Sequence, residues 1–222
     1  MCDTGARRLV LQQRLLSHND AHAARNRQQF EQRGLRVVNL LSAPGSGKTS
    51  LLERLAQHWP RPPIGVVVGD LATDRDATRL QQAGARAVQI RTGDRCHLDA
   101  AVVERAVAQI DTDEMDLLVI ENVGNLVCPS AFDLGEQRRV AVLAVTEGED
   151  KPLKYPALFG SADAVLINKN DLAAVVGFDR AAARRHLQAV APRAVVFEVS
   201  AISGEGLAAW IDWLDQPCGP DR

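Results

Sequence analysis

The chain has 222 residues, enough for one large α/β domain with a small extension. Hydrophobic residues make up 46%, charged residues 24%, and the formal net charge is −2, so we expect no nucleic-acid partner and no membrane partner. No apolar run approaches the roughly 20 residues that cross a bilayer, and the N-terminal stretch is too polar for a signal-peptide core, which predicts a cytoplasmic protein. The four cysteines are therefore expected as thiols or metal ligands rather than disulfides.

The N-terminal region predicts helix. Residues 7–33 form two helical pieces in this interpretation, broken near the polar run at 17–20, with Asn19 or Asp20 capping the second piece. Gly34 is expected to end it. We expect the chain to have three parts. Residues 1–33 form a helical extension that acts as a lid or docking arm, residues 34–215 form the main domain, and residues 216–222 form a flexible tail.

From Leu35 onward, short apolar runs alternate with amphipathic stretches. The apolar runs predict seven strands, at 36–42, 64–70, 86–91, 116–121, 139–145, 163–168 and 194–199. The amphipathic stretches predict helices at 47–58, 74–83, 99–110, 179–190 and 205–214. This alternation is typical of a three-layer α/β fold with a mainly parallel seven-stranded sheet covered on both faces. Ligands of such folds gather at the carboxyl ends of the strands.

The first strand runs into a glycine-rich turn with the spacing of a phosphate-binding P-loop, which predicts a P-loop NTPase fold. Gly45 and Gly47 allow backbone N–H groups to approach a phosphate, and the next helix points its N-terminus at the same anion. Ser42 stands where the usual pattern has its first glycine. A tight strand-to-helix turn with a solvated lysine is the alternative. The expected nucleotide contacts are Pro44, Gly45, Ser46, Gly47, Lys48, Thr49 and Ser50.

Two later strand ends carry residues suited to a guanine base. Asn168-Lys169-Asn-Asp171 has the Asn-Lys-x-Asp pattern. In this pattern the Asp171 carboxylate can accept hydrogen bonds from the guanine N1–H and N2 amino group, a pair of donors that adenine lacks. Asn168 can bond the other edge of the base, and the Lys169 stem can lie along the ring. Ser200-Ala201 follows the last strand, and the Ala201 N–H can meet the guanine carbonyl oxygen. A plain polar turn at a helix start is the alternative.

Carboxylates at two other strand ends suit a magnesium ion beside the γ-phosphate. Asp70 and Glu121 are expected to join the Thr49 hydroxyl around Mg²⁺, directly or through water. Gly124 can present its N–H to the γ-phosphate, and Asp76 can position or deprotonate the attacking water. Together with Lys48, these residues form the expected catalytic set. An acid in the first turn of a helix is an equally good interpretation of Asp76.

Cysteine and histidine occur together in two predicted loops. Cys96-His97 precedes one helix, and Cys128 follows the strand that ends at Glu121. Two thiolates and an imidazole suit Ni²⁺ or Zn²⁺, although spacing alone favours two buried thiols and an unrelated histidine. His18 and His22 are four residues apart on a helix and can chelate a metal, but surface solvation is their expected state.

Four segments resemble the HypB family of hydrogenase nickel-incorporation GTPases: Gly93-Asp-Arg-Cys-His-Leu-Asp-Ala, Glu121-Asn-Val-Gly-Asn-Leu-Val-Cys-Pro, Thr146-Glu-Gly-Glu-Asp-Lys-Pro-Leu-Lys-Tyr-Pro and Asn168-Lys-Asn-Asp. The likeness extends over residues 14–214. Ser42 is also usual in that family, so it does not weaken the P-loop interpretation.

The resemblance implies a GTPase of the signal-recognition-particle/MinD class that hydrolyses GTP to GDP slowly and forms a homodimer promoted by GTP. It implies a Ni²⁺ or Zn²⁺ site at Cys96, His97 and Cys128 near the dimer interface. It also implies two protein partners, the nickel chaperone HypA and the large-subunit precursor of [NiFe]-hydrogenase. Of the N-terminal Cys-x-x-Cys-Gly-Cys motif of some members only Cys2 is present, so we expect no second nickel site there and no storage role.

Three other functions are weighed against this one. A nickel GTPase serving urease would carry a Cys-Pro-His metal motif, whereas Cys128 is followed by Pro129-Ser130. A P-loop kinase of small molecules would need an acceptor-binding lid and has no need of Asn168-Lys-Asn-Asp. A passive metal-storage protein would need more ligands than this chain offers.

Overall fold

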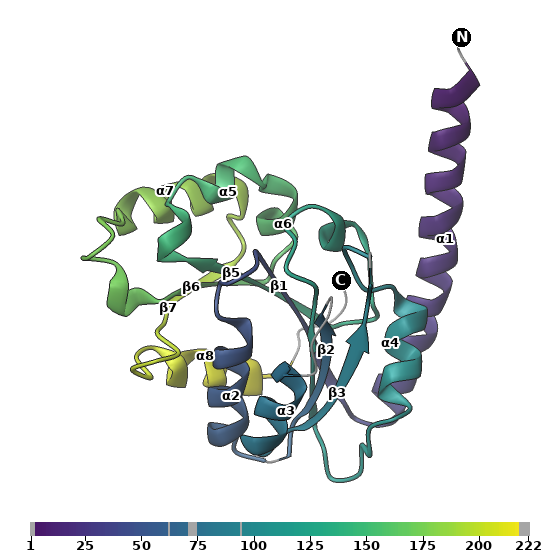
Figure 1. Cartoon of the computed structure of the whole chain (residues 1–222), viewed down its shortest axis with the longest axis horizontal. Coiled ribbons are helices and arrows are strands. Elements are labelled where there is room, and N and C mark those ends of the chain that lie inside the picture. The colour runs from purple at the N-terminus through teal and green to yellow at the C-terminus, as the bar shows by residue number, and fades with distance from the viewer. Residues whose placement is uncertain (1–2, 62, 71–74, 94, 218–222) are drawn as a thin grey trace.

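The computed structural model describes residues 3–61, 63–70, 75–93 and 95–217, with side chains from Leu16 onward. Cys2, Cys218 and most of the predicted tail lie outside the described residues. A central sheet with helices on both faces forms the body, and the first turns of a long N-terminal helix extend away from it (Figure 1). Within the described part, no helix has the length and apolar character needed to cross a membrane.

The sheet confirms the predicted number of strands, and all its pairings are parallel. Its strands are β1 (Arg36–Ser42), β2 (Gly65–Asp70), β3 (Arg86–Arg91), β4 (Leu117–Glu121), β5 (Arg138–Ala144), β6 (Ala164–Asn168) and β7 (Val195–Glu198). Their order is β3-β2-β4-β1-β5-β6-β7. Because β1 lies between β4 and β5, with Leu40 opposite Glu121, the ends of β1 and β4 meet at one edge.

Helices cover both faces of the sheet, which confirms the three-layer fold. They are α1 (Asp3–Gln32), α2 (Lys48–His58), α3 (Arg75–Gln82), α4 (Ala100–Val107), α5 (Lys151–Lys154), α6 (Pro156–Gly160), α7 (Arg180–Val190) and α8 (Leu207–Asp215). Successive residues of β1 alternate between faces, so that Val38 and Leu40 pack with α2, α3 and α8. Val37 packs with α1 and α4, and Leu41 with α6 and α7. This alternation is the two-residue period of a strand buried on both sides.

Helix α1 is continuous, so the predicted break near residues 17–20 is wrong. The Asn19 side chain does not cap a second helix, because it reaches across to the body of the protein. Its Nδ2 donates to the Asp133 carbonyl at 2.7 Å, and its Oδ1 accepts from the Ala100 N–H at 2.9 Å. Gly34, with a φ of 65°, follows the end of the helix as predicted. The domain boundaries at 33 and 215 stay predictions.

Asn26 gives a direct test of how α1 is held. Its side chain is fully buried, and Nδ2 donates to the carbonyls of Ala100 at 2.9 Å and Leu134 at 3.0 Å. The Asn26→Ala variant leaves both buried acceptors without this donor, so we expect the free energy of unfolding to fall by about 1–3 kcal/mol. Equilibrium urea unfolding measures the change. Gln28→Ala, at an exposed position of the same helix, is the control, and equal losses in the two variants would contradict the role of Asn26.

Candidate nucleotide and metal site

The turn between β1 and α2 forms a cradle with its backbone folded tightly. Gly45 and Gly47 have φ angles of 72° and 95°, in the region that glycine adopts most easily. A Cβ at Gly47 would lie 2.6 Å from Nδ2 of Asn168, so a larger residue cannot occupy the position without displacing that side chain. The helix begins at Lys48, directly after this turn. The predicted phosphate-binding geometry is therefore present.

Ser42 acts as the polar centre of the cradle. Its Oγ accepts hydrogen bonds from Ser46 Oγ at 2.6 Å and from Lys48 Nζ at 2.8 Å, and donates to the Ala43 carbonyl at 2.7 Å. Burial lowers the pKa of Lys48 because its ammonium loses water. Nearby carboxylates, with Glu121 first, oppose that effect. A bound phosphate would add further negative charge beside the same ammonium.

Thr49 and Glu121 meet beside the cradle and fit a divalent cation. Thr49 Oγ1 donates to Oε1 of Glu121 at 3.0 Å. The Glu121 carboxyl is buried, and its Oε2 has no hydrogen-bond partner among the described residues. Burial raises the pKa of Glu121 to about 7, although the Lys48 charge opposes it. A buried carboxylate oxygen that lacks a partner is a suitable ligand for Mg²⁺, which prefers oxygen donors.

These groups face one cavity of about 500 Å³. Eleven of the predicted site residues line it: Pro44, Gly45, Gly47, Lys48, Thr49, Ser50, Asp70, Asp76, Glu121, Gly124 and Lys169. Four further lining residues did not figure among the sequence predictions: Gly69, Arg79, Asn122 and Val123. Because polar groups from β1, β2, β4 and β6 converge here, the cavity lies at the carboxyl edge of the sheet, where ligands of such folds bind.

Asp76 and Gly124 both line this cavity. Asp76 is in the first turn of α3, and its Oδ1 is 3.5 Å from the guanidinium Nη1 of Arg79. It is thus both a first-turn acid and a lining residue, and its role toward water stays a prediction. A Cβ at Gly124 would lie 2.9 Å from the Cα of Pro44, so glycine allows the loop after β4 to approach the cradle closely.

The segment predicted to recognise the base is tied to the cradle by two side chains. Asn168 Nδ2 donates to the Ser46 carbonyl at 2.8 Å, and Lys169 Nζ donates to the Gly45 carbonyl at 2.7 Å. Lys169 has a φ of 62°, which is uncommon for a residue with a side chain. Asn168 therefore braces the P-loop backbone, a role that the sequence did not predict for it.

Asp171, three residues after Asn168, lies beside Ser200. The Ser200 hydroxyl donates to Oδ1 of Asp171 at 2.5 Å, which orients an otherwise exposed carboxylate. The Ala201 N–H donates to Oδ1 of Asn168 at 3.3 Å, so in this state it is already engaged. The structure brings these residues together next to the cradle, and their contacts with a guanine base stay predictions.

Cys96, His97 and Cys128 form a second cluster. Their ligand atoms all lie within 4.8 Å of one another, and Cys96 Sγ is 3.6 Å from His97 Nδ1. The adjacent Cys96 thiol and, secondly, burial raise the pKa of Cys128, and burial lowers the pKa of His97. These shifts favour the protonated thiol of Cys128 and the neutral imidazole of His97. A metal ion that binds the cysteine as a thiolate must therefore displace its proton. Although spacing alone did not favour a metal site, the fold assembles a suitable set of ligands.

Two residues that the sequence analysis missed support this cluster. Asn122 is buried directly after Glu121, and its Oδ1 accepts from the Leu98 N–H at 3.2 Å. It thus joins the end of β4 to the loop that carries His97. The His97 ring stacks on Phe132, with centroids 3.9 Å apart. A polar residue after an apolar strand was a signal for Asn122, whereas nothing in the sequence indicated Phe132.

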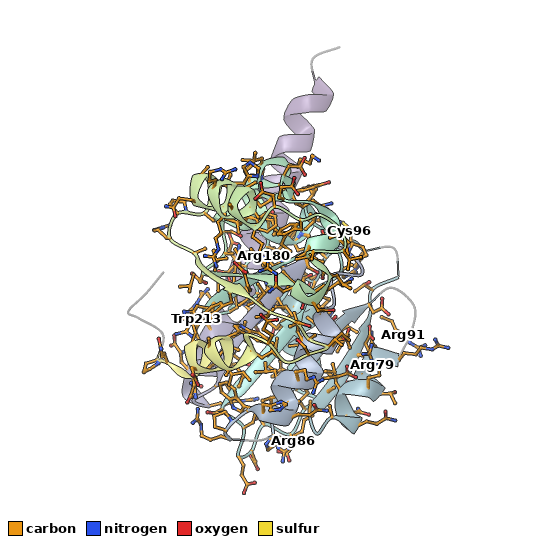
Figure 2. All side chains as sticks on the ribbon, turned by 90° about the vertical axis from the view of Figure 1, so that its left-hand side faces the viewer. Arg79, Arg86, Arg91, Cys96, Arg180 and Trp213 are labelled. Carbon is orange, nitrogen blue, oxygen red and sulfur yellow. The ribbon has the colours of Figure 1, made fainter. Side chains whose placement is uncertain are left out.

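The loop after β4 belongs to both sites. Glu121, the last residue of β4, and Gly124, in the loop, line the nucleotide cavity, and Cys128, in the short 3₁₀ helix Cys128–Ala131, is part of the Cys-His-Cys cluster. In Figure 2, Cys96 of the cluster and Arg79 of the cavity lie on the same right-hand side of the molecule. The two sites therefore share one short segment of chain.

Comparison with known proteins identifies the family. A model of the nucleotide-binding domain of the CobW/HypB/UreG family matches residues 36–198. The chain is 52% identical to hydrogenase maturation factor HypB of Azotobacter vinelandii, over 96% of this chain and 71% of that protein. The chain belongs to the HypB family. Its membership confirms the resemblance expected from the four sequence segments.

Solved HypB structures have the same fold. HypB from Helicobacter pylori in complex with nickel is 42% identical, with a TM-score of 0.85 over 89% of this chain and 93% of that one. HypB from Archaeoglobus fulgidus is 40% identical, with a TM-score of 0.83 over 90% and 98% of the two chains. The P-loop NTPase fold is therefore confirmed. Nucleotide binding and nickel binding are both consistent with membership of the HypB family.

Proposed function

We propose that this HypB-family chain is a GTP-hydrolysing metallochaperone that gates the insertion of Ni²⁺ into the large subunit of [NiFe]-hydrogenase during maturation. The observation that carries the proposal is the loop after β4. It follows Glu121, the last residue of β4, and supplies Gly124 to the nucleotide cavity, which Glu121 also lines, and Cys128 to the Cys-His-Cys cluster. A change at the γ-phosphate therefore has a short covalent path to a metal ligand.

In this proposal the cradle holds the phosphates, and Mg²⁺ is held by Thr49, Asp70 and Glu121. The ion supplies charge neutralisation at the β- and γ-phosphates when bound. The hydrogen bond from Thr49 to Glu121 holds both groups side by side. The orphaned Oε2 of Glu121 supports this assignment, since it is buried and has no hydrogen-bond partner within the described part of the chain.

The remaining catalytic roles follow from position along the cavity. Lys48 places its ammonium at the base of the cradle, where charge develops on the transferred phosphoryl group. Gly124 offers its backbone N–H to the γ-phosphate, and Asp76 orients or deprotonates the attacking water from α3. Asp171 selects guanine, with its carboxylate oriented by Ser200.

Nickel is the cargo of the second site in this proposal. Cys96, His97 and Cys128 supply three ligands, so water or a second subunit completes the coordination. A GTP-promoted homodimer would bring a second cluster to the first. Zn²⁺ fits the same donors and is the competing occupant. Nickel chaperone HypA and the hydrogenase precursor are the proposed donor and acceptor, in the cytoplasm.

The gating role gives a test of the proposed function. We expect the GTP and GDP forms to differ in Ni²⁺ affinity by a coupling of roughly 1–3 kcal/mol, and Ni²⁺ must change GTP affinity by the same factor. Cys128→Ser should weaken Ni²⁺ binding and erase most of that difference while GTP binding persists, because the variant cuts the link between the β4 loop and the metal. Nickel titration of both proteins in both nucleotide states measures the coupling.

A variant in the same short helix controls for local disturbance. Ser130→Ala removes a hydroxyl that donates to the Val127 carbonyl at 2.8 Å and leaves the three proposed ligands in place. It should retain the nucleotide dependence of nickel affinity. Equal nickel affinity in the two nucleotide states of the unmodified protein would leave Cys128 a structural thiol and would contradict gating.

A further inference from the structure

A second cavity, of about 390 Å³, adjoins the Cys-His-Cys cluster. It is lined by His18, Asn19, His22, Arg95, His97, Asp99, Ala101 and Phe132. His97 therefore contributes to the wall of this cavity as well as to the cluster. Facing the same space are two histidines of α1, to which the proposed GTPase mechanism gives no role.

His18 and His22 are arranged as a chelating pair. They are one helical turn apart on α1, and their ring centroids are separated by 4.9 Å with planes inclined at 52°. Two histidines at this spacing on one helical face can bind a single metal ion. Borderline nitrogen donors of this kind suit Ni²⁺, Zn²⁺ and Cu²⁺.

The carboxylate of Glu104 supplies the second indication of a metal site. His22 Nδ1 lies 2.9 Å from Oε2 of Glu104, which is on α4. Histidines that bind metals commonly donate their other ring N–H to a carboxylate, which fixes the ring and leaves Nε2 for the ion. Arg25 lies 2.7 Å from the same Nδ1 and competes as a donor, so a metal at Nε2 selects the tautomer that donates to Glu104.

We propose that His18 and His22, oriented by Glu104, bind a divalent transition-metal ion and act as a loading position for the Cys-His-Cys cluster. The binding stands on the geometry of α1 and α4 alone, and the loading role rests on the proposed function. Transfer is a ligand exchange in which the charge of the ion does not change. A bond from the ion to an α1 imidazole breaks as a bond to His97 forms, and the cysteine thiols release their protons to solvent as they bind.

The first experiment isolates the new site. All four cysteines are replaced by serine, and Ni²⁺ is added in a calorimetric titration. We expect one ion per chain, bound by the α1 pair. His18→Ala/His22→Ala should abolish this binding, and Glu104→Gln should weaken it by about 10-fold or more. The control is His58→Ala/His186→Ala. These two histidines belong neither to this cavity nor to the Cys-His-Cys cluster, so their replacement should leave Ni²⁺ binding unchanged.

The same titration can overturn the proposal. His18 is exposed and His22 is partly exposed, so the double alanine variant should keep its fold, which circular dichroism checks. Unchanged Ni²⁺ binding in that folded variant would overturn the site. Loss of binding in the His58/His186 control as well would overturn its assignment to α1.

The second experiment tests loading in the chain with its cysteines intact. After stopped-flow mixing with less than one equivalent of Ni²⁺, the thiolate-to-nickel absorption reports arrival at Cys96 and Cys128. His18→Ala/His22→Ala should slow this signal several-fold and leave its final amplitude unchanged. An unchanged rate would overturn the loading role, and so would a lost amplitude, which would make the pair permanent ligands. Neither result bears on GTP hydrolysis or on its coupling to Cys128, so this inference and the proposed function fail separately.

Discussion

Lys48→Ala is expected to fold normally and to lose GTP hydrolysis, with kcat falling by at least about 100-fold. The Lys48 ammonium is buried at the base of the nucleotide cavity and is held 2.8 Å from Ser42 Oγ. Charge that develops on the phosphoryl oxygens would lose this preorganised partner, and solvent cannot replace it in a buried position. Phosphate release at saturating GTP and Mg²⁺ measures the effect.

The control for this variant is Lys154→Ala, which removes a lysine that pairs with Asp150 at the exposed surface of α5. It should hydrolyse GTP at the normal rate. Thermal melting followed by circular dichroism shows whether both variants are folded. If Lys48→Ala is folded and hydrolyses GTP as fast as the control, the P-loop residues do not perform the role proposed for them.

Asp171→Asn is expected to weaken the free energy of GTP binding by on the order of a few kcal/mol. It should also shift the preference of the protein toward xanthosine nucleotides. The carboxylate accepts from two guanine donors in the proposed complex, and an amide cannot accept from both. Its NH₂ group can instead donate to the additional carbonyl of xanthine, which a carboxylate would repel. Competition between GTP and xanthosine triphosphate for a fluorescent nucleotide measures both affinities.

Asp212→Asn provides the matched control, since it makes the same chemical change at an exposed position of α8. Its GTP affinity should equal that of the unmodified protein. The hydrogen bond from Ser200 to Asp171 can also form with the amide oxygen of the variant, so the local fold should persist. Normal GTP affinity in Asp171→Asn would remove this residue from the recognition of the base.

Much of the sheet could be predicted because its strands are continuous apolar runs, the pattern that burial on both faces requires. The prediction of α1 was wrong where a local rule met a tertiary contact. The polar residues near Asn19 are typical of a helix cap, but the Asn19 side chain is satisfied by Asp133 and Ala100 far along the chain. Helices α5 and α6 were not predicted, since Pro152 and Pro156 indicate a break, although proline is favoured in the first turn of a helix.

The two sites differed in how far they could be predicted. The cradle residues lie within one short segment whose spacing has a known physical meaning. The proposed metal ligands come from two loops, and no local pattern shows that Cys96 and Cys128 approach each other. That approach depends on the placement of β4 inside the sheet, between β2 and β1, and on the buried hydrogen bond from Leu98 to Asn122. Spacing could not reveal either, so the resemblance to HypB sequences was the better indication.

The side chains of Asn168 and Lys169 donate hydrogen bonds to the carbonyls of Ser46 and Gly45. The protein's own hydrogen bonds thus support the shape of the cradle, and the conformational entropy of ordering the loop is lost during folding rather than at each binding event. Nucleotide exchange in such a protein is the departure of one ligand and the arrival of another at a preformed surface.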